Sequence, residues 1–424
     1  MSTATPRTDA PILLLLGASA REYRGYMLEQ IATEHQVVLL DSAPPAWTRP
    51  HLAAQITVDL TDHDATLRAA KEAAAVRPVA GVLTYLEHYV ELAARIAQDL
   101  GLPAPTPEAV EACRDKATTR RLLAAHGVPS ARSVVVTTPD EAVAAADTIG
   151  YPVVIKPRGM AGSAGVRRAD TPADIRAFYQ AATTETVLGL DEHAVAGVLV
   201  EEYLAGPEIS VECVVLGSGR VEVVAVTRKH LGPEPGFQET GHTVDATDPL
   251  RRDPDVHAVA HAALEAVGIT TGVMHVEMRL TPSGPRIVEI NARLGGDLIP
   301  RLVELATGVN LPLAAARLAT GQRPDLTETL QRAAAIEFQY PTAPGRIGHT
   351  TLTEATAPWI ERLVVTRQVG DLVAAPPHAA LDDRLAFALV TGPDAATCRR
   401  RTRTALNHLT VRIDQPVHVT ACVR

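Results

Sequence analysis

Aromatic side chains are scarce in this chain of 424 residues, where Phe, Trp and Tyr together make up 3%. Because apolar residues still reach 46%, the core has to be built mainly from Ala, Val and Leu. Proteins that bind single-stranded nucleic acid stack the bases on aromatic rings, so this composition argues against such a partner. The net charge of -9 also disfavours a polyanionic partner, although a local basic pocket for a small phosphate is compatible with it.

Cysteines are few, and none has a neighbour at a short, paired spacing. The four, Cys113, Cys213, Cys398 and Cys422, indicate neither a zinc site nor a disulfide framework. Long hydrophobic runs are also missing, since the apolar run at residues 11–16 is far shorter than a membrane span. No basic stretch with an apolar segment and a cleavage site precedes it. We therefore expect a cytoplasmic protein with no membrane partner.

Several common catalytic and binding motifs are absent. Gly17 follows an apolar run as in a dinucleotide-binding turn, but the pattern GxGxxG is not there. Lys156 precedes the glycine-rich stretch 159–165, so this stretch is not the loop GxxxxGK[ST]. HAVAH, residues 257–261, lacks the glutamate of HExxH, and no GxSxG elbow accompanies the serines. Metalloprotease and serine-hydrolase chemistry therefore have little support.

The N-terminal residues alternate between strand and helix patterns. Residues 12–19 and 37–42 predict buried strands, and residues 81–85 predict a third before a helix over 87–100. This alternation is typical of an α/β domain with a parallel sheet. The proline-containing run 102–107 predicts a linker. The length of the chain indicates two to four domains, and the C-terminal part alternates strands and helices as a small α+β domain does.

The most informative stretch is GVMHVEMRLTPSGPRIVEINARLGGD, residues 272–297. Two runs of β-branched residues flank the turn TPSGP, which predicts a β-hairpin. With this turn, Leu280 opposes Arg286. Counting back along both strands then puts Glu277 directly across from Glu289. Opposed carboxylates destabilise a sheet unless a cation lies between them, and oxygen-only ligands suggest Mg²⁺. The alternative is a solvated hairpin whose acids face water.

Three further stretches suggest binding loops. A buried strand ends at Lys156 before the glycine-rich stretch, where backbone N–H groups can approach phosphate oxygens closely. Residues 198–216 predict two acid-rich strands around a short turn. The acidic side chains of these strands either lie exposed on a sheet face or bind an adenine amino group and ribose hydroxyls. Residues 231–250 predict a long loop, and such loops tend to be lids or binding loops.

Four motifs occur in an order that resembles the ATP-grasp superfamily of carboxylate-amine ligases. They are Asp115-Lys116, IKP with its glycine loop, EEYL followed by Glu208, and Glu277 with EINAR. Within this superfamily the chain is most similar to L-amino-acid ligases that make dipeptides, mainly through EEYL, the ETGH segment at residues 239–242 and NARLGGD. The resemblance covers most of the chain.

The resemblance implies a mixed α/β and α+β architecture, the ATP-grasp fold, in three domains. These are an N-terminal Rossmann-like pre-ATP-grasp domain at residues 1–103, an ATP-grasp domain at 104–320 with its lid subdomain at about 130–205, and a small C-terminal α+β domain at 321–424. A homodimer is usual for the family.

The resemblance also implies roles for individual residues. Those that would bind ATP are Lys116 and Lys156 at the phosphates, Gly162 and Ser163 in the loop over them, Glu201 with the backbone of Tyr203 and Leu204 at the adenine, and Glu208 at the ribose. Those that would hold two Mg²⁺ ions, with Mn²⁺ able to substitute, are Glu277, Glu289 and Asn291. On the substrate side, Arg293 would be catalytic together with Lys156. Gly295 and Gly296 would lie beside the substrate carboxylate, and Glu239 and His242 would orient the amine.

The chemistry implied is an ADP-forming ligation. ATP phosphorylates a small-molecule carboxylate, and an amine attacks the resulting acyl phosphate to give an amide between amino-acid-like substrates. The alternative within the superfamily is a ligase like biotin carboxylase or those of the purine pathway. A third hypothesis, from another class, is an ATP-binding module that senses the nucleotide without catalysis. The residues leave open whether the C-terminal domain contributes to the site.

Overall fold

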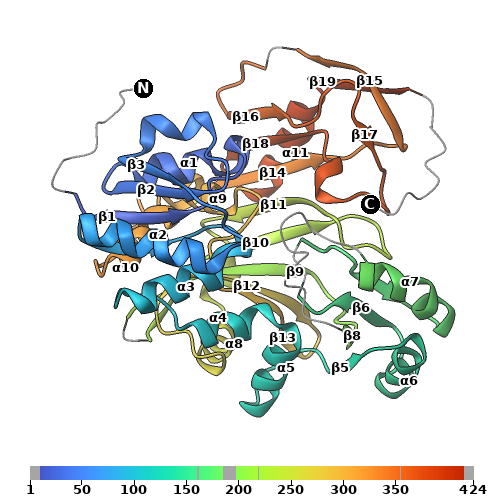
Figure 1. The fold of residues 1–424 in the computed structure, drawn as a ribbon. Helices are drawn as coiled ribbons and strands as arrows, with labels where there is room; N and C mark the ends of the chain where they lie inside the picture. The colour runs from blue at the N-terminus through green and yellow to red at the C-terminus, as the bar shows by residue number, and fades with distance from the viewer. Residues whose placement is uncertain (1–9, 160–161, 185–196, 218, 354, 415–424) are drawn as a thin grey trace. The chain divides into compact units, whose positions relative to one another are not determined.

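The computed structural model describes residues 10–159, 162–184, 197–217, 219–353 and 355–414 (Figure 1). The chain forms two compact units, each assembled from three segments. The first unit consists of Met1–Ser130, Ile209–Val226 and Pro249–Thr329. The second consists of Ala131–Glu208, Thr227–Asp248 and Leu330–Arg424. Residues of one unit are therefore far apart in the sequence.

A parallel four-stranded sheet in the order β3-β2-β1-β4 opens the first unit. All five residues of β1 are buried, as expected for a parallel strand covered on both faces. The elements of this part are β1 (Ile12–Leu16), α1 (Arg21–Ile31), β2 (Gln36–Asp41), η1 (Ala46–His51), β3 (Ala54–Thr57), α2 (His63–Val76), β4 (Val79–Leu83), η2 (Glu87–Tyr89) and α3 (Val90–Asp99). The predicted α/β opening is confirmed.

The second part of the first unit is a sheet in the order β13-β12-β9-β10, packed on helices. Its core contains Val211, Val276 and Ala260, all fully buried, so the aromatic-poor composition is matched by an aliphatic interior. The elements are α4 (Pro107–Arg114), α5 (Lys116–Ala125), β9 (Glu208–Val215), β10 (Val221–Leu231), η4 (Pro249–Arg252), α8 (Pro254–Ala266), β12 (Gly272–Thr281), β13 (Gly284–Asn291), α9 (Ile299–Thr307) and α10 (Leu311–Ala319). β9 begins one residue inside the second unit, and β10 continues into it from Thr227.

The second unit contains a small sheet in the order β5-β8-β6-β7 with α6 and α7 side by side against it (Figure 1). Its elements are β5 (Ser133–Val136), α6 (Pro139–Ile149), β6 (Val153–Pro157), β7 (Arg167–Ala169), α7 (Pro172–Thr184) and β8 (Val198–Glu202). The two acid-rich strands predicted over residues 198–216 are β8 and β9. They do not pair with each other, because β8 bonds to β5 and β6 while β9 lies next to β12.

The rest of the second unit is built on antiparallel strands in the order β10-β11-β14-β18-β16, with α11 packed on β14 and β18. Its elements are β11 (Glu239–Asp245), β14 (Ala333–Gln339), β15 (Gly345–Leu352), β16 (Ile360–Val365), β17 (Leu372–Val373), η5 (Leu381–Asp383), β18 (Ala386–Gly392), α11 (Ala395–Leu406) and β19 (Leu409–Asp414). The prediction of one long loop over residues 231–250 is wrong. β11 occupies its middle and pairs with β10 and β14.

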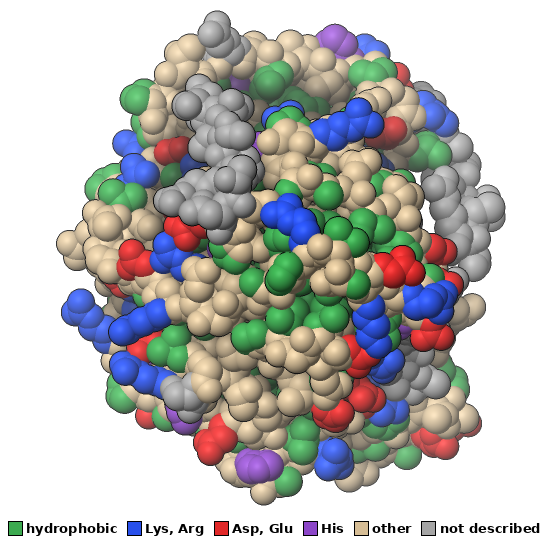
Figure 2. All heavy atoms as spheres, turned by 60° about the vertical axis from the view of Figure 1, so that its left-hand side comes forward, with side chains coloured by type: hydrophobic (Ala, Val, Ile, Leu, Met, Phe, Trp, Pro, Cys, Tyr) green, Lys and Arg blue, Asp and Glu red, His purple; other side chains and the backbone are tan. Residues whose placement is uncertain are grey.

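Cys113, Cys213 and Cys398 are buried free thiols, and Cys422 lies outside the described residues. No single helix in the described ranges is long and apolar enough to cross a membrane. Among the described helices, α9 and α10 taken together have the length and apolar composition of a membrane span, but the pair is bent by 108° at the break between them. On the face drawn in Figure 2, basic and acidic side chains are interspersed. The acidic excess of the chain is therefore not gathered in one field on that face.

Candidate active site

The hairpin β12–β13 places Glu277 directly opposite Glu289, as the sequence predicts. The register nearer the turn is different from the predicted one, because Arg279, not Leu280, faces Arg286 and the turn is only two residues long. A register shift next to Glu277 inserts Val288 as an extra residue on β13. This β-bulge offsets the shorter turn by one residue, so the two acids still face each other.

Helix α5 reaches this hairpin through two basic side chains one turn apart. Asp115 caps α5 by accepting hydrogen bonds from the N–H groups of Ala117 and Thr118, and this fixes Lys116 at the first helical position. The Lys116 Nζ lies 3.0 Å from Glu289 Oε1, and 7% of the lysine side chain is exposed. From the next turn, Arg120 Nη2 donates to the carbonyl of Val288 at 2.6 Å. The same helix therefore holds the bulge and neutralises one of the opposed acids.

The other acid, Glu277, is bound by a buried histidine. His275 Nε2 donates to Glu277 Oε1 at 3.1 Å, and His275 Nδ1 donates to Glu212 at 3.0 Å. Ser210 Oγ donates to the same Glu212 carboxylate at 2.8 Å. Burial by itself would lower the pKa of His275, but the charges and hydrogen bonds of Glu212 and Glu277 outweigh it and raise the pKa to about 10. Each opposed carboxylate thus has its own cationic partner within the protein.

Asn291 and Arg293 follow at the end of β13. The Arg293 guanidinium donates through Nη2 to Asn291 Oδ1 at 3.2 Å, through Nη1 to the Leu294 carbonyl at 2.8 Å and through Nε to Glu87 Oε2 at 2.5 Å. Burial would raise the pKa of Glu87, but Arg293 and Arg114 hold it below its ordinary value. Arg293 is therefore fixed on three sides by charge-assisted and carbonyl hydrogen bonds.

The two glycines after Arg293 have different surroundings. A Cβ on Gly295 would lie 3.0 Å from His275 Nδ1 and 3.2 Å from Glu212 Oε2, so this backbone packs directly on the Glu212–His275 pair. A Cβ on Gly296 would meet nothing within 4 Å. The space beside Gly296 agrees with the room that a substrate carboxylate would need, whereas Gly295 is required for packing.

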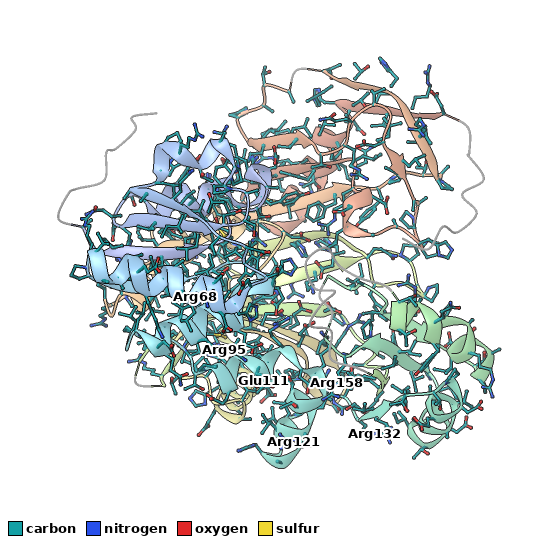
Figure 3. All side chains as sticks on the ribbon, viewed as in Figure 1. Arg68, Arg95, Glu111, Arg121, Arg132 and Arg158 are labelled. Atoms are coloured by element: carbon teal, nitrogen blue, oxygen red, sulfur yellow. The ribbon has the colours of Figure 1, made fainter. Side chains whose placement is uncertain are left out.

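The second unit brings together Lys156 and Glu201. β6 and β8 are adjacent antiparallel strands in which Val154 faces Glu201, so Lys156 is the diagonal neighbour of Glu201 on the same face. Lys156 Nζ lies 2.5 Å from Glu201 Oε2, and the side chains are 6% and 4% exposed. Arg158, labelled in Figure 3, follows Pro157 and marks this end of β6. Lys156 and Glu201 therefore form a buried ion pair that is almost fully shielded from solvent.

The glycine-rich stretch after β6 is described in part, since residues 160–161 lie outside the described residues. Gly162 and Ser163 have left-handed φ values of 67° and 58°. Glycine adopts this conformation freely, whereas for Ser163 it costs on the order of 1 kcal/mol. Ala in place of Gly162 would also put its Cβ 2.6 Å from Leu381 Cδ1. The loop therefore depends on Gly162 for its left-handed conformation, whereas the tip of the flexible Leu381 side chain can move aside.

Tyr203 and Leu204 come directly after β8. The Tyr203 hydroxyl donates to Glu234 Oε1 at 2.7 Å, and the guanidinium of Arg168 lies 4.6 Å from the Tyr203 ring. Arg168 also donates to Glu234 Oε2 at 2.5 Å. The Tyr203 side chain is therefore held by Glu234 of the β10–β11 loop and by Arg168. The predicted role of its backbone at the adenine stays a prediction.

Lys229 on β10 collects two of the predicted site residues. Its Nζ lies 2.9 Å from Glu208 and 2.6 Å from Glu239, and its side chain is 2% exposed. His242 faces Lys229 across the β10–β11 pair, and His242 Nε2 lies 3.3 Å from Glu239 Oε2. Burial would raise the pKa of Glu239, but Lys229 and His242 hold it well below its ordinary value. Glu239 is therefore a carboxylate bound by two basic side chains.

The backbone of Glu239 is held by residues from the C-terminal part of the chain. Arg384 Nη2 donates to the Glu239 carbonyl at 3.1 Å, and the Tyr340 hydroxyl donates to it at 3.4 Å. Arg384 Nε in turn donates to the Tyr340 oxygen at 3.0 Å, and its guanidinium lies 3.6 Å from the centre of the Phe338 ring. With 3% of its surface exposed, Arg384 is an internal support for the segment that carries Glu239 and His242.

Sequence reasoning did not single out several residues that complete these contacts: Glu87, Arg120, Lys229, His275 and Arg384. The partners are distant in sequence, 206 residues in the case of Glu87 and Arg293. Glu212 lies within the acid-rich residues 198–216, but the sequence pattern gives it no role of its own. One signal was available, since a Lys, a His or a Glu inside a predicted buried strand must be paired.

Comparison with known proteins identifies the family. Residues 149–301 match the ATP-grasp domain, residues 34–104 the ATP-grasp N-terminal domain, and residues 337–414 the L-amino acid ligase C-terminal domain 2. The phosphoribosylamine–glycine ligase of Mycobacterium leprae is 30% identical over 299 residues, which are 67% of this chain and 68% of that one. The chain belongs to the ATP-grasp superfamily of carboxylate-amine ligases.

Other ATP-grasp relatives extend the comparison. Human carnosine synthase 1 is 29% identical over 310 residues, 69% of this chain and 37% of that protein. The crystal structure of L-amino acid ligase from Bacillus licheniformis superposes with a TM-score of 0.80 at 20% identity, covering 96% of this chain and all of that one. The chain spans less than two thirds of the length of several curated relatives. The structural likeness shows the fold.

ATP-grasp enzymes use ATP and a divalent metal ion and act on small molecules. The oxygen donors of Glu277, Glu289 and Asn291 on one hairpin fit a hard cation such as Mg²⁺. The basic side chains that the two units provide, Lys116 in the first and Lys156 in the second, fit phosphate oxygens. The donor chemistry of each unit is therefore compatible with the family's requirements.

Proposed function

We propose that the chain is an ADP-forming ligase that joins two amino-acid-like substrates through an amide bond, with an acyl phosphate as the intermediate. One observation carries this proposal. The region that matches the L-amino acid ligase C-terminal domain supplies Tyr340 and Arg384, and both bind the carbonyl of Glu239. The part of the chain that matches this domain therefore contacts the backbone of a residue that we assign to the amine substrate.

The reaction has two steps. In the first, an oxygen of the substrate carboxylate attacks the γ-phosphorus of ATP, the bond to the bridging oxygen breaks, and ADP leaves. In the second, the amine nitrogen of the other substrate attacks the acyl carbon, and phosphate leaves with the bond electrons. The amine must lose a proton, and Glu239, held as a carboxylate by Lys229 and His242, is the residue we assign to orient or accept it.

Lys116 and Lys156 would bind phosphate oxygens of ATP, with Gly162 and Ser163 in the loop over them. Glu201 and the backbone of Tyr203 and Leu204 would take the adenine, and Glu208 the ribose. Glu277, Glu289 and Asn291 would hold two divalent ions, which when bound neutralise charge on the transferred phosphoryl group.

Arg293 would contact that phosphoryl group and the substrate carboxylate, and it is prepared for this by three fixed hydrogen bonds. Because an acyl phosphate hydrolyses in water, the site has to be closed during turnover. The loop with Gly162 and Ser163 and the β10–β11 loop, residues 232–238, would provide this cover. The hydrogen bond from the Tyr203 hydroxyl to Glu234 ties the β10–β11 loop to the end of β8.

The test is phosphate release from Mg-ATP with amino acids supplied singly and in pairs, combined with mass spectrometry of the products. We expect release only with a productive pair, and a product with the summed mass minus water. Release with bicarbonate, or with phosphoribosylamine and glycine, would instead assign the chain to a carboxylase or a purine-pathway ligase. ATP binding without ADP formation across the whole panel would support a nucleotide sensor and contradict the proposal.

A further inference from the structure

Three members of the hydrogen-bonded row Ser210–Glu212–His275–Glu277 in the first unit, all except Glu277, have no role in the reaction as derived above. Two of its members, Glu212 and His275, are 1% and 5% exposed in their side chains. A carboxylate can only accept hydrogen bonds, and both ring nitrogens of His275 face carboxylates, so each nitrogen carries a proton. The row therefore places a buried imidazolium between a buried carboxylate and a carboxylate that borders the site.

His275 contacts a second predicted metal ligand through its backbone. It is the register partner of Asn291 across the hairpin, and the Asn291 amide donates to the His275 carbonyl at 3.4 Å. Its ring therefore holds Glu277, and its peptide group holds Asn291. On the other side, the Gly295 backbone packs closely on the ring, since a Cβ added there would lie 3.0 Å from Nδ1.

We propose that His275 and Glu212 are positioning residues for the divalent-cation site: Glu212 fixes the imidazole, and the imidazole fixes the carboxylate of Glu277 and the strand position of Asn291. This inference rests on the proposed function, because it takes Glu277 and Asn291 as metal ligands. Groups that hydrogen-bond to metal ligands commonly change metal affinity about 10- to 100-fold when they are removed. Ser210 completes the row by donating to Glu212 Oε1, the oxygen that lies 3.0 Å from His275 Nδ1.

The experiment separates geometry from charge. In the double variant His275→Gln/Glu212→Gln, the three side chains at positions 212, 275 and 277 keep a net charge of about minus one, as in the unchanged chain with an imidazolium and two carboxylates. Mn²⁺ is titrated into the nucleotide-free full chain, and free Mn²⁺ is followed by electron paramagnetic resonance. We expect the dissociation constant for Mn²⁺ to rise about 10- to 100-fold, with metal-free ADP binding changed less than about twofold.

Two further variants complete the test. Glu212→Gln alone leaves the residues next to the ion unchanged, and we expect a smaller rise in the same direction, which keeps the test decisive if the double variant does not fold. His261→Gln is the matched control, because this histidine is half exposed on α8 and its ring lies 3.8 Å from Glu265 on the same helix. It should bind Mn²⁺ as the unchanged chain does.

The outcomes distinguish this inference from the proposed function. If Glu277→Gln weakens Mn²⁺ binding but the double variant and Glu212→Gln do not, the metal ligand stands and the positioning role is wrong. If Glu277→Gln itself has no effect, the assignment of the metal site fails, and the positioning role fails with it. Weakened binding in the double variant, with a thermal unfolding temperature close to that of the unchanged chain, supports the proposal.

Discussion

Arg293 Nε donates a hydrogen bond of 2.5 Å to Glu87 Oε2, across 206 residues of sequence. Glu87 lies at the start of η2 in the Rossmann-like part of the first unit, and Arg293 follows β13 in its second sheet. Their side chains are 15% and 12% exposed. The segment that follows the N-terminal sheet thus contributes directly to the orientation of the arginine that we place at the transferred phosphate.

Glu87→Gln should lower kcat/KM about 10- to 100-fold, because a hydrogen bond between charged groups contributes roughly 1.5 to 3 kcal/mol. Steady-state kinetics with the carboxylate substrate varied would measure this. Glu91→Gln is the control, since Glu91 pairs with Arg95 and lies 3.6 Å from Arg114 without reaching Arg293. Equal kinetics in both variants would contradict an orienting role for Glu87.

Glu289→Gln should reduce turnover roughly 100- to 1000-fold, the range found when one group that stabilises a transition state is removed. The side chain is 21% exposed and Gln can still accept a hydrogen bond from Lys116, so the unfolding temperature should change little. Activity assays and a thermal melt check both parts. Glu265→Gln on α8, 77% exposed, is the control. A Glu289→Gln enzyme with unimpaired turnover would remove this residue from the site.

Much of the site hairpin could be predicted from sequence, because a strand alternates its side chains with a period of two. The pairing of Glu277 with Glu289 is confirmed, but two errors cancel to give it: the turn is shorter than predicted, and Val288 bulges. The bulge could not be foreseen, since the side chain that binds its carbonyl, Arg120, is 168 residues away on α5. Local patterns do not encode contacts of this range.

β11 was missed for a related reason. Its sequence ETGHTVD lacks the alternation of a half-buried strand, and it lies between segments rich in Gly and Pro. It becomes a strand because it pairs with β10 on one side and with β14, nearly a hundred residues later, on the other. Tertiary pairing overrides weak local preference here. The predicted roles of the individual site residues, the domain boundaries and a cytoplasmic location stay predictions.

Lys229→Met should destabilise the protein by about 3 to 5 kcal/mol, because it leaves the largely buried carboxylates of Glu208 and Glu239, 9% and 18% exposed, without their shared cation. Urea unfolding followed by circular dichroism measures the shift. The comparison is Lys71→Met, which removes an exposed pair with Asp99 and should cost less than about 1 kcal/mol. Similar losses in the two variants would show that burial does not decide the strength of these pairs.

The second unit should lose stability as the pH is lowered, because His230 is buried in its neutral form. Burial, with the charges of His242, Arg399 and Arg228, lowers the pKa of His230 to about 4. In the unfolded chain its pKa is about 6.5, so between pH 6.5 and 4 His230 is protonated in the unfolded chain but neutral in the folded one. The stability that is fully present above pH 6.5 is therefore lost as the pH falls through this range.

His230→Asn should reduce the slope of the unfolding free energy against pH in this acid range. The reduction corresponds to at most one proton taken up on unfolding, or about 1.4 kcal/mol per pH unit. Urea midpoints at a series of pH values provide the measurement, and His261→Asn on the exposed face of α8 is the control. An unchanged slope in His230→Asn would mean that this histidine is already protonated in the folded protein.

Arg384→Gln should lower kcat/KM for the amine substrate about 10-fold, since the Glu239 carbonyl loses a hydrogen bond from a charged donor. Arg401→Gln is the matched control. Arg401 also belongs to the C-terminal part, but it lies 5.2 Å from the Trp359 ring and donates to the carbonyl of Thr391 instead of that of Glu239. If both variants lose activity equally, the effect comes from the stability of the C-terminal part and not from the support of Glu239.

The bulge at Val288 has a practical consequence for protein engineering. It divides the β12–β13 hairpin into two stretches with different registers, one at the turn and one at the acids. Pro282 and Ser283, which form the turn, are exposed. The two stretches are joined through a residue that α5 holds in place, so the tip can be lengthened independently of the acids. Residues 282–283 are therefore a suitable position for a fluorescent label or an affinity tag that reports on the hairpin without replacing any candidate ligand.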